Sequence, residues 1–325
     1  MCSAGRLAGI VLLFLQLTAC SHTLQTTRLQ QSPPAALPSS HELAATPFFP
    51  QRRYQCGPAA LATVLGAQGV RVHPDGLVDK VYLPARQGSV PLEMEAAARS
   101  YGMLVYPLEP RLEALLAEVA AGYPVLVLQN LRFSWWPRWH YAVVVGYDLE
   151  RSQVVLRSGE TRRYRVAMGV FEKTWRRAEH WARVILPPEG MPASAKPLTY
   201  LRAALALEQS RQVDAALSSY RTASRQWPES ALAWLAHGNL AYRLGDYASA
   251  ESSFRDGVAH LPQQADLWNN LGYALAGQGC VEEALAAVRC ALVLQPDSTA
   301  YGESLDELKG AGGQHGRCEP VTCPF

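Results

Sequence analysis

The chain has 325 residues and a formal net charge of +2, and 49% of its residues are hydrophobic. That length allows two modest domains. The 30 lysines and arginines are nearly balanced by 28 acidic residues and form no basic cluster, which argues against a nucleic-acid-binding function. None of the cysteine and histidine spacings is typical of a zinc site, and neither a metal nor an organic cofactor is implied.

The N-terminus resembles that of a bacterial lipoprotein. An apolar stretch, residues 7–15, is too short for an ordinary transmembrane span and is typical of a signal-peptide core. The following Leu17-Thr18-Ala19-Cys20 resembles a lipoprotein box, which implies a signal peptide over residues 1–20 with lipid attached to Cys20. By the same resemblance, Ser21 implies an outer-membrane anchor facing the periplasm. The alternative is a simple secretory signal whose cleavage site happens to contain a cysteine.

A flexible tether is predicted for residues 21–46, which are polar and rich in proline, serine and threonine. Residues 47–190 predict one compact α+β domain. Its aromatic loop, residues 133–139, would either shape a substrate groove or shield the core. We expect helices at 91–100, 111–121 and 171–178, and strands at 104–106, 123–128, 141–147, 154–156 and 181–186.

A cysteine stands where a helix is predicted to begin, in the sequence Gln55-Cys56-Gly57-Pro58. The N-terminus of a helix lowers the pKa of a thiol there, which favours the nucleophilic thiolate. Gly57 would leave room for a substrate backbone, and proline suits the first helical turn. A buried structural cysteine is the alternative. The flanking pattern and a histidine further along the chain favour a catalytic thiol instead.

That histidine, His140, opens the apolar stretch 141–147, which is predicted to be a buried strand. A nucleophilic cysteine at a helix start and a histidine at a strand start form the papain-like arrangement. With its Cys-Gly-Pro-Ala box and His-Tyr-Ala-Val-Val-Val strand, the chain resembles the bacteriocin-processing, double-glycine-type cysteine peptidases. The resemblance covers roughly residues 48–188 and implies a papain-like fold that hydrolyses peptide bonds through Cys56 and His140.

The remaining site residues are assigned partly by this resemblance. The family places an oxyanion-stabilising glutamine several residues before the cysteine, which corresponds to Gln51. Relatives usually carry an aspartate near the end of the second strand, but this chain has Leu156-Arg157-Ser158-Gly159 there. Asp148 is a poor substitute, because eight strand residues place it about 26 Å from His140. Antiparallel return instead predicts Ser158 beside the imidazole as the orienting group.

Three blocks of 34 residues follow one another over residues 197–298. An aromatic residue recurs at the fourth position of each block, an alanine at the twentieth and a proline at the thirty-second. This pattern is similar to tetratricopeptide repeats and predicts an all-α solenoid. The aligned residues are Tyr200, Trp234 and Trp268; Ala216, Ala250 and Ala284; and Pro228, Pro262 and Pro296.

Residues 299–325 are predicted to be a cap followed by a loose tail. Four of the seven cysteines remain once Cys2 in the signal peptide, the lipid site and the nucleophile are set aside, and their pairing is open. Cys280 and Cys290 are ten residues apart, about 15 Å along a helix, and are not expected to bond to each other. A link between Cys318 and Cys323 is left open.

Together these features predict an α+β papain-like peptidase domain followed by a tetratricopeptide solenoid, in a lipid-anchored protein of the bacterial envelope. Its expected partners are a peptide or protein substrate, a protein bound by the repeats, and the membrane that holds the anchor. Because Ser158 stands where relatives carry an acid, a non-enzymatic scaffold lipoprotein with a degenerate peptidase fold is one alternative. A cell-wall amide hydrolase using the same thiol chemistry is the other.

Overall fold

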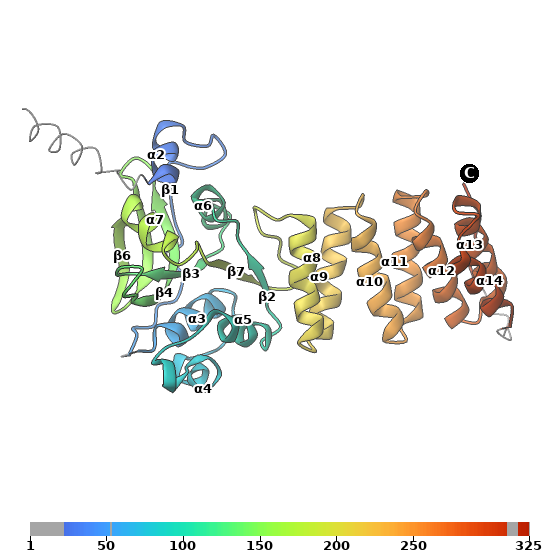
Figure 1. Cartoon of the computed structure of the whole chain (residues 1–325), viewed down its shortest axis with the longest axis horizontal. Helices are drawn as coiled ribbons and strands as arrows, with labels where there is room; N and C mark the ends of the chain where they lie inside the picture. The colour runs from blue at the N-terminus through green and yellow to red at the C-terminus, as the bar shows by residue number, and fades with distance from the viewer. Residues whose placement is uncertain (1–22, 53, 311–317, 325) are drawn as a thin grey trace, which may run out of the picture.

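The computed structural model describes residues 23–52, 54–310 and 318–324, so the predicted signal peptide and Cys20 lie outside the described residues. An antiparallel sheet with helices on both faces forms the N-terminal domain, and a row of paired helices extends from one edge of it (Figure 1). None of the described helices is both long and apolar enough to cross a membrane. The sheet domain and the helical array confirm the predicted fold class, an α+β domain followed by an all-α solenoid.

Seven strands form the sheet in the order β2-β7-β3-β4-β5-β6, and β1 pairs with the free side of β4 near its end. The central strands are apolar on both faces because helices cover both. One face packs against α3 and α5, and the other against α6 and α7. The strands are β1 (Ser40–Glu42), β2 (Leu104–Pro107), β3 (Val125–Asn130), β4 (Trp139–Asp148), β5 (Gln153–Ser158), β6 (Thr161–Ala167) and β7 (Ala182–Leu186).

The helices of this domain include the three that periodicity predicts, with ends that differ by a few residues. Strand β6 was not predicted, because its exposed residues lack the apolar alternation of a buried strand. Besides α2, described below, the helices are α3 (Cys56–Ala67), η1 (Pro74–Leu77), α4 (Val78–Val81), η2 (Pro84–Arg86), α5 (Pro91–Arg99), α6 (Leu112–Ala120) and α7 (Met168–Arg176).

The prediction of a flexible tether over residues 21–46 is wrong for two parts of this segment, which form a helix and a strand. Residues Leu24–Gln31 form helix α2, which packs against α6 and α7, and β1 lies a few residues further on. Buried Glu172 accepts hydrogen bonds from the N–H groups of Gln25 and Thr26 and from the Thr26 hydroxyl. These contacts satisfy helix-start N–H groups with a carboxylate, which a composition-based prediction does not detect.

The helical array follows the predicted repeats closely. The first helix of each pair begins at the first residue of its 34-residue block, and Ala216, Ala250 and Ala284 are fully buried where the helices cross. The pairs are α8 (Pro197–Gln209) with α9 (Val213–Gln226), α10 (Ala231–Arg243) with α11 (Tyr247–His260), and α12 (Ala265–Gly277) with α13 (Val281–Leu294), followed by the cap helix α14 (Thr299–Gly310).

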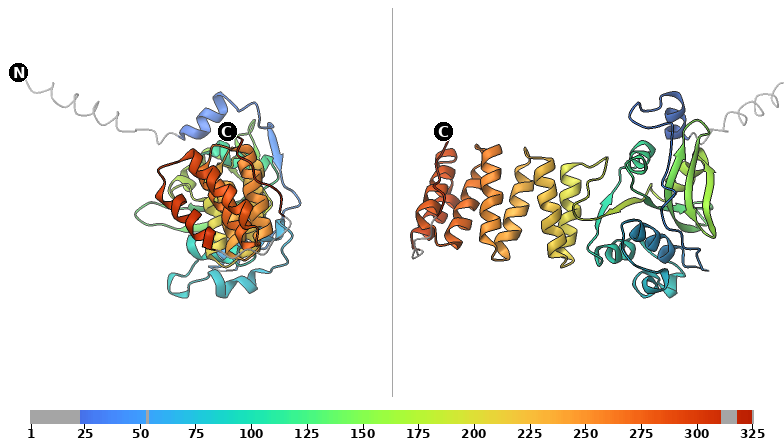
Figure 2. Two further views of the ribbon diagram at one scale, coloured as in Figure 1. Left: turned by 90° about the vertical axis from the view of Figure 1, so that its right-hand side faces the viewer. Right: turned by 180° about the vertical axis from the view of Figure 1, so that it is seen from behind.

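The junction segment, residues 187–196, joins the array to the sheet through hydrogen bonds and apolar contacts. Buried Glu118 accepts hydrogen bonds from the backbone N–H groups of Ala193 and Ser194 and from the Ser194 hydroxyl. Tyr200 on α8 donates to the carbonyls of this segment and belongs to the same hydrophobic cluster as Tyr106 on β2. The array therefore continues from the β2 edge of the sheet, and the right-hand view of Figure 2 shows it extending away from the domain.

The prediction of a loose tail is also wrong for residues 318–324. Disulfides join Cys280 to Cys318 and Cys290 to Cys323, with Cα–Cα distances of 6.0 and 5.5 Å. The tail thus runs alongside α13 and packs against the last cluster of the array. The link between Cys318 and Cys323 does not form, because each of these cysteines meets a partner more than thirty residues away in the sequence.

Candidate active site

Cys56 is the first residue of α3, and its side chain is half-buried. Burial raises the pKa of the Cys56 thiol, and the backbone N–H groups of Tyr141, Gly57 and Cys56 itself, which face the sulfur, lower it by less. The expectation that the helix start gives a low pKa is therefore wrong for this closed site, because desolvation outweighs the N–H groups. The contact with Tyr141 also places the start of β4, and hence His140, next to α3.

His140 lies near the start of β4, and its Nε2 is 2.8 Å from the Ser158 hydroxyl. Burial, aided by the guanidinium of Arg138, lowers the pKa of His140 to about 4. The imidazole is therefore neutral at physiological pH. Its Nδ1 has no hydrogen-bond partner among the described residues, so the hydrogen bond to Ser158 leaves this nitrogen unoccupied.

Ser158 is the last residue of β5, and the pairing of β5 with β4 brings it back to His140. This is the position that hairpin geometry predicts. Asp148 lies at the opposite end of β4, where it pairs with Gln153 and forms an ion pair with Arg151. Asp148 therefore cannot orient the imidazole, also as predicted.

Gln51 lies on a segment that runs beside the turn between β5 and β6, where its N–H donates to the Gly159 carbonyl. It lines a small cavity together with Cys56, Tyr141 and Ser158. The cavity measures about 10 Å³, close to the least space that holds one water molecule. The cavity as it stands is therefore too small to hold a substrate side chain.

Gly57 plays a different role from the one expected. A Cβ at this position would lie 2.1 Å from the Ser89 hydroxyl and 3.2 Å from the Met94 sulfur. The missing side chain therefore makes room for the residues that pack against α3, and not for a substrate.

The aromatic loop before His140 does not shield the core. Its large side chains are between 52% and 79% exposed: Phe133, Trp135, Trp136 and Trp139. Buried Asn130 fixes the backbone of this loop, because its Oδ1 accepts from the N–H groups of Arg132 and Arg138 and its Nδ2 donates to the Phe133 carbonyl. Sequence reasoning missed Asn130, whose position at the end of a buried strand is the only available signal.

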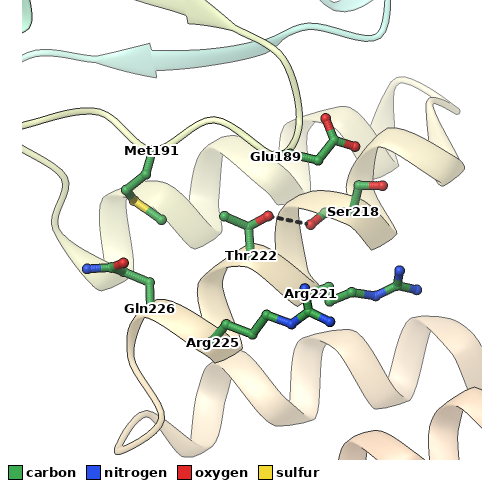
Figure 3. A pocket seen from close by; sticks show the side chains of 7 residues that line it. All are labelled: Glu189, Met191, Ser218, Arg221, Thr222, Arg225 and Gln226. Atoms are coloured by element: carbon green, nitrogen blue, oxygen red, sulfur yellow. Dashed lines mark hydrogen bonds between the residues drawn. The ribbon is translucent and has the colours of Figure 1, made fainter. Parts of the chain in front are cut away.

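Another cavity, of about 440 Å³, lies between the junction segment and α9 (Figure 3). Arg221 and Arg225 line it from α9, and the Thr222 hydroxyl donates to the Ser218 carbonyl. None of the candidate catalytic residues lines this cavity. The chemistry that the sequence predicts is therefore confined to the start of α3 and the ends of β4 and β5.

Comparison with known proteins assigns both parts of the chain. Residues 43–182 match the Peptidase C39 like family, and residues 201–256 and 235–299 match the tetratricopeptide repeat. The chain joins a C39-like peptidase domain to tetratricopeptide repeats. No curated protein matched the chain.

Solved structures resemble the two parts separately. A C39-like peptidase from Bacillus anthracis is 17% identical, with a TM-score of 0.39, over 45% of this chain and 97% of that one. A double-glycine-motif protease in complex with a leader peptide is 21% identical, with a TM-score of 0.34, over 45% and 92%. The first tetratricopeptide domain of Spaghetti, bound to an HSP90 peptide, is 21% identical, with a TM-score of 0.33, over 36% and 92%.

The C39-like domain suggests a cysteine peptidase, and the tetratricopeptide repeats imply interaction with another protein. Both statements agree with the predictions from the sequence.

Proposed function

We propose that this protein is a lipid-anchored cysteine peptidase of the bacterial envelope that hydrolyses peptide bonds through Cys56 and His140. The observation that carries the proposal is the contact between His140 and the Ser158 hydroxyl, beside a cysteine at a helix start. A third residue that orients the histidine is what nucleophilic thiol catalysis requires.

In the proposed mechanism, the Nε2–H of His140 donates to Ser158 and leaves Nδ1 free to act as a base. The Cys56 sulfur attacks the peptide carbonyl carbon while its proton passes to Nδ1, and Gln51 stabilises the oxyanion. Nδ1 then protonates the leaving amine as the C–N bond breaks, which leaves a thioester. Water attacks the thioester, His140 accepts its proton, and the free acid and the Cys56 thiol are released.

The proposed location rests on the Cys20 motif, which lies outside the described residues. The two disulfides in the array support it, because such bonds persist in oxidising compartments such as the periplasm. Replacing Cys20 with serine should abolish lipid labelling and shift the protein out of the membrane fraction. Unchanged partition and an intact lipid label would overturn the proposed anchor.

A scaffold protein without enzymatic activity is the second candidate, and the electrostatics of the site favour it. A raised thiol pKa and a lowered histidine pKa keep the pair uncharged at rest. Iodoacetamide distinguishes the candidates at neutral pH: a peptidase should be alkylated at Cys56, whereas a degenerate site should not react. Alkylation should slow when His140 is replaced with alanine, because the imidazole no longer accepts the proton.

Mass spectrometry of a periplasmic extract tests the peptidase directly. Incubation with the wild-type protein should produce new peptide termini that are missing with Cys56→Ala. Release of peptidoglycan fragments, with no new protein termini, would instead identify a cell-wall amide hydrolase. Alkylation without either product would contradict the proposed activity.

A further inference from the structure

The aromatic loop is the densest group of exposed apolar side chains on the described surface of the peptidase domain. Phe133 and Trp135 stack on each other with ring centroids 5.5 Å apart, and Arg132 lies over the ring of Trp136. Exposed apolar patches of this kind mark interaction sites, because water around large aromatic faces is released on binding.

The loop is built to hold this surface in place. In addition to its contacts with Asn130, its two sides are joined by a hydrogen bond from the Leu131 N–H to the Arg138 carbonyl. Arg177, directly after the end of α7, also donates to the Asn130 carbonyl. A fixed aromatic surface binds with a small loss of conformational entropy.

The aromatic loop directly precedes His140, which places it near the part of a substrate that follows the cleaved bond. In the proposed mechanism His140 protonates the leaving amine, so this amine must lie within hydrogen-bond reach of the imidazole. The substrate chain beyond that amine runs toward the C-terminal side of the cleaved bond. It therefore leaves the site beside Trp139, the residue that joins the loop to His140.

A membrane surface fits this loop less well. Residue 139 begins β4 and residue 148 ends it, so the two ends lie about 30 Å apart. The described N-terminal part is attached at the far end, where β1 pairs with Asp148 and Gln30 on α2 donates to Ser152. In Figure 1, α2 lies at the edge of the domain opposite to α3 and α4. A membrane that holds the N-terminus would thus face away from the loop.

We infer that the aromatic loop, residues 133–139, binds apolar side chains of the substrate segment that follows the cleaved bond. This inference rests on the proposed peptidase function and adds a substrate class to it: peptides with aromatic or large aliphatic residues shortly after the cleavage site. Trp135 and Trp136 supply the binding surface, and Trp139 connects it to the catalytic histidine.

The test uses a pool of random twelve-residue peptides and the chain with Cys20→Ser, so that a lipid anchor cannot contribute. Sequencing of the products should show aromatic and large aliphatic residues enriched at the second to fifth positions after the cut. The variant Trp135→Ser/Trp136→Ser should lose this enrichment. For one enriched peptide, kcat/KM should fall about tenfold, mainly through KM, as expected when a buried aromatic contact is removed.

A matched control separates the loop from general surface effects. Leu92→Ser/Val293→Ser replaces two exposed apolar residues elsewhere, 68% and 60% exposed, and should keep both the enrichment and kcat/KM. Equal melting temperatures for the three proteins show that each is folded. An unchanged cleavage pattern in the tryptophan variant overturns the inference.

A binding arm separates failure of the inference from failure of the proposed function. Immobilised Cys56→Ala protein should capture apolar peptides from the same pool, and capture should require Trp135 and Trp136. Such capture without any cleavage by the wild-type protein supports the docking surface and refutes the peptidase. Vesicles of phosphatidylethanolamine and phosphatidylglycerol are the competing probe. Binding to these vesicles, or dimer formation, that depends on the tryptophans while peptide capture does not would overturn the inference.

Discussion

Ser158 gives His140 a neutral hydrogen-bond partner at the position where the sequence resemblance implies a carboxylate. A hydroxyl can hold the imidazole ring in place, but it adds no charge to stabilise the imidazolium that forms during catalysis. Burial and Arg138 already hold the pKa of His140 at about 4. The histidine is therefore well oriented but a weak proton acceptor, and the third position should limit turnover.

Substitutions at this position should separate orientation from charge. Ser158→Ala should lower kcat about fivefold, because one neutral hydrogen bond is lost. Ser158→Asp should raise kcat above the wild-type value, because a carboxylate favours the imidazolium. Asp148→Ala, at the far end of β4, is the matched control and should change little. Loss of activity in Asp148→Ala with Ser158→Ala intact would show that the assignment is wrong.

The pH profile gives an independent reading of the same residue. Catalysis needs a neutral imidazole, so kcat/KM of the wild-type protein should rise as the pH increases through about 4, the pKa of His140. In Ser158→Asp the carboxylate raises the histidine pKa, and the acid limb should move to higher pH by a unit or more. A wild-type acid limb centred near the unperturbed histidine value of about 6.5 would contradict a buried imidazole.

For single residues, the sequence predicts which side chains lie next to each other better than it predicts their pKa values. The contact between His140 and Ser158 follows from counting residues around one hairpin, and it is confirmed. The raised pKa of Cys56 could not be predicted, because it depends on how β4 and the segment around Gln51 enclose the sulfur. The exposure of the aromatic loop was open for the same reason, since pockets and cores use the same side chains.

Two buried glutamates fix segments for which the sequence predicts neither helix nor strand. Glu172 accepts from Gln25 and Thr26 at the start of α2, and Glu118 accepts from Ala193 and Ser194 in the junction segment. The partners are 146 and 76 residues apart in the sequence, so no local pattern reveals them. The two disulfides to the tail could not be predicted for the same reason, because their cysteines are far apart in the sequence. The repeat boundaries could be predicted because they follow from the 34-residue period.

Removing the Glu172 carboxylate should release α2 without unfolding the domain. Glu172→Ala loses three hydrogen bonds to one charged acceptor, which should weaken the docking of α2 by about 3 kcal/mol. Amide hydrogen exchange in residues 24–31 should then accelerate by about a hundredfold. Exchange in β4 should not change. Glu150→Ala, which removes an exposed carboxylate, is the control, and equal protection of α2 in both variants would refute the role of Glu172.

At the scale of the whole molecule, the array and the sheet form one continuous body. Tyr200, Leu201 and Ala204 on α8 share a hydrophobic cluster with Leu104 and Tyr106 on β2. The first repeat therefore covers an edge of the peptidase domain, while the third repeat packs against the second repeat, α14 and the described part of the tail. The two ends of the array should contribute very differently to the stability of the peptidase domain.

Truncation tests this asymmetry. Deleting Ala265–Phe325 exposes the packing surface of the second repeat and should lower the melting temperature of the array, with the peptidase domain unchanged. Deleting Lys196–Phe325 uncovers β2 and should lower the melting temperature of the peptidase domain itself. Intrinsic fluorescence and amide exchange in β3 and β4 report on that domain. Equal stability of the peptidase domain in both truncated proteins would show that the shared cluster contributes nothing.

The docking of α2 also limits how far the enzyme can reach. Gln25, the first residue held by Glu172, is five residues from Cys20, a span of at most about 17 Å when fully extended. On the proposed anchoring, the thiol lies a further strand length away, at the other end of β4. The active site would then stay at an almost constant distance from the membrane surface, within a thin layer of the periplasm. Encounter would depend on the substrate's local density in that layer and on lateral diffusion, and proteins in the bulk periplasm would rarely be cut.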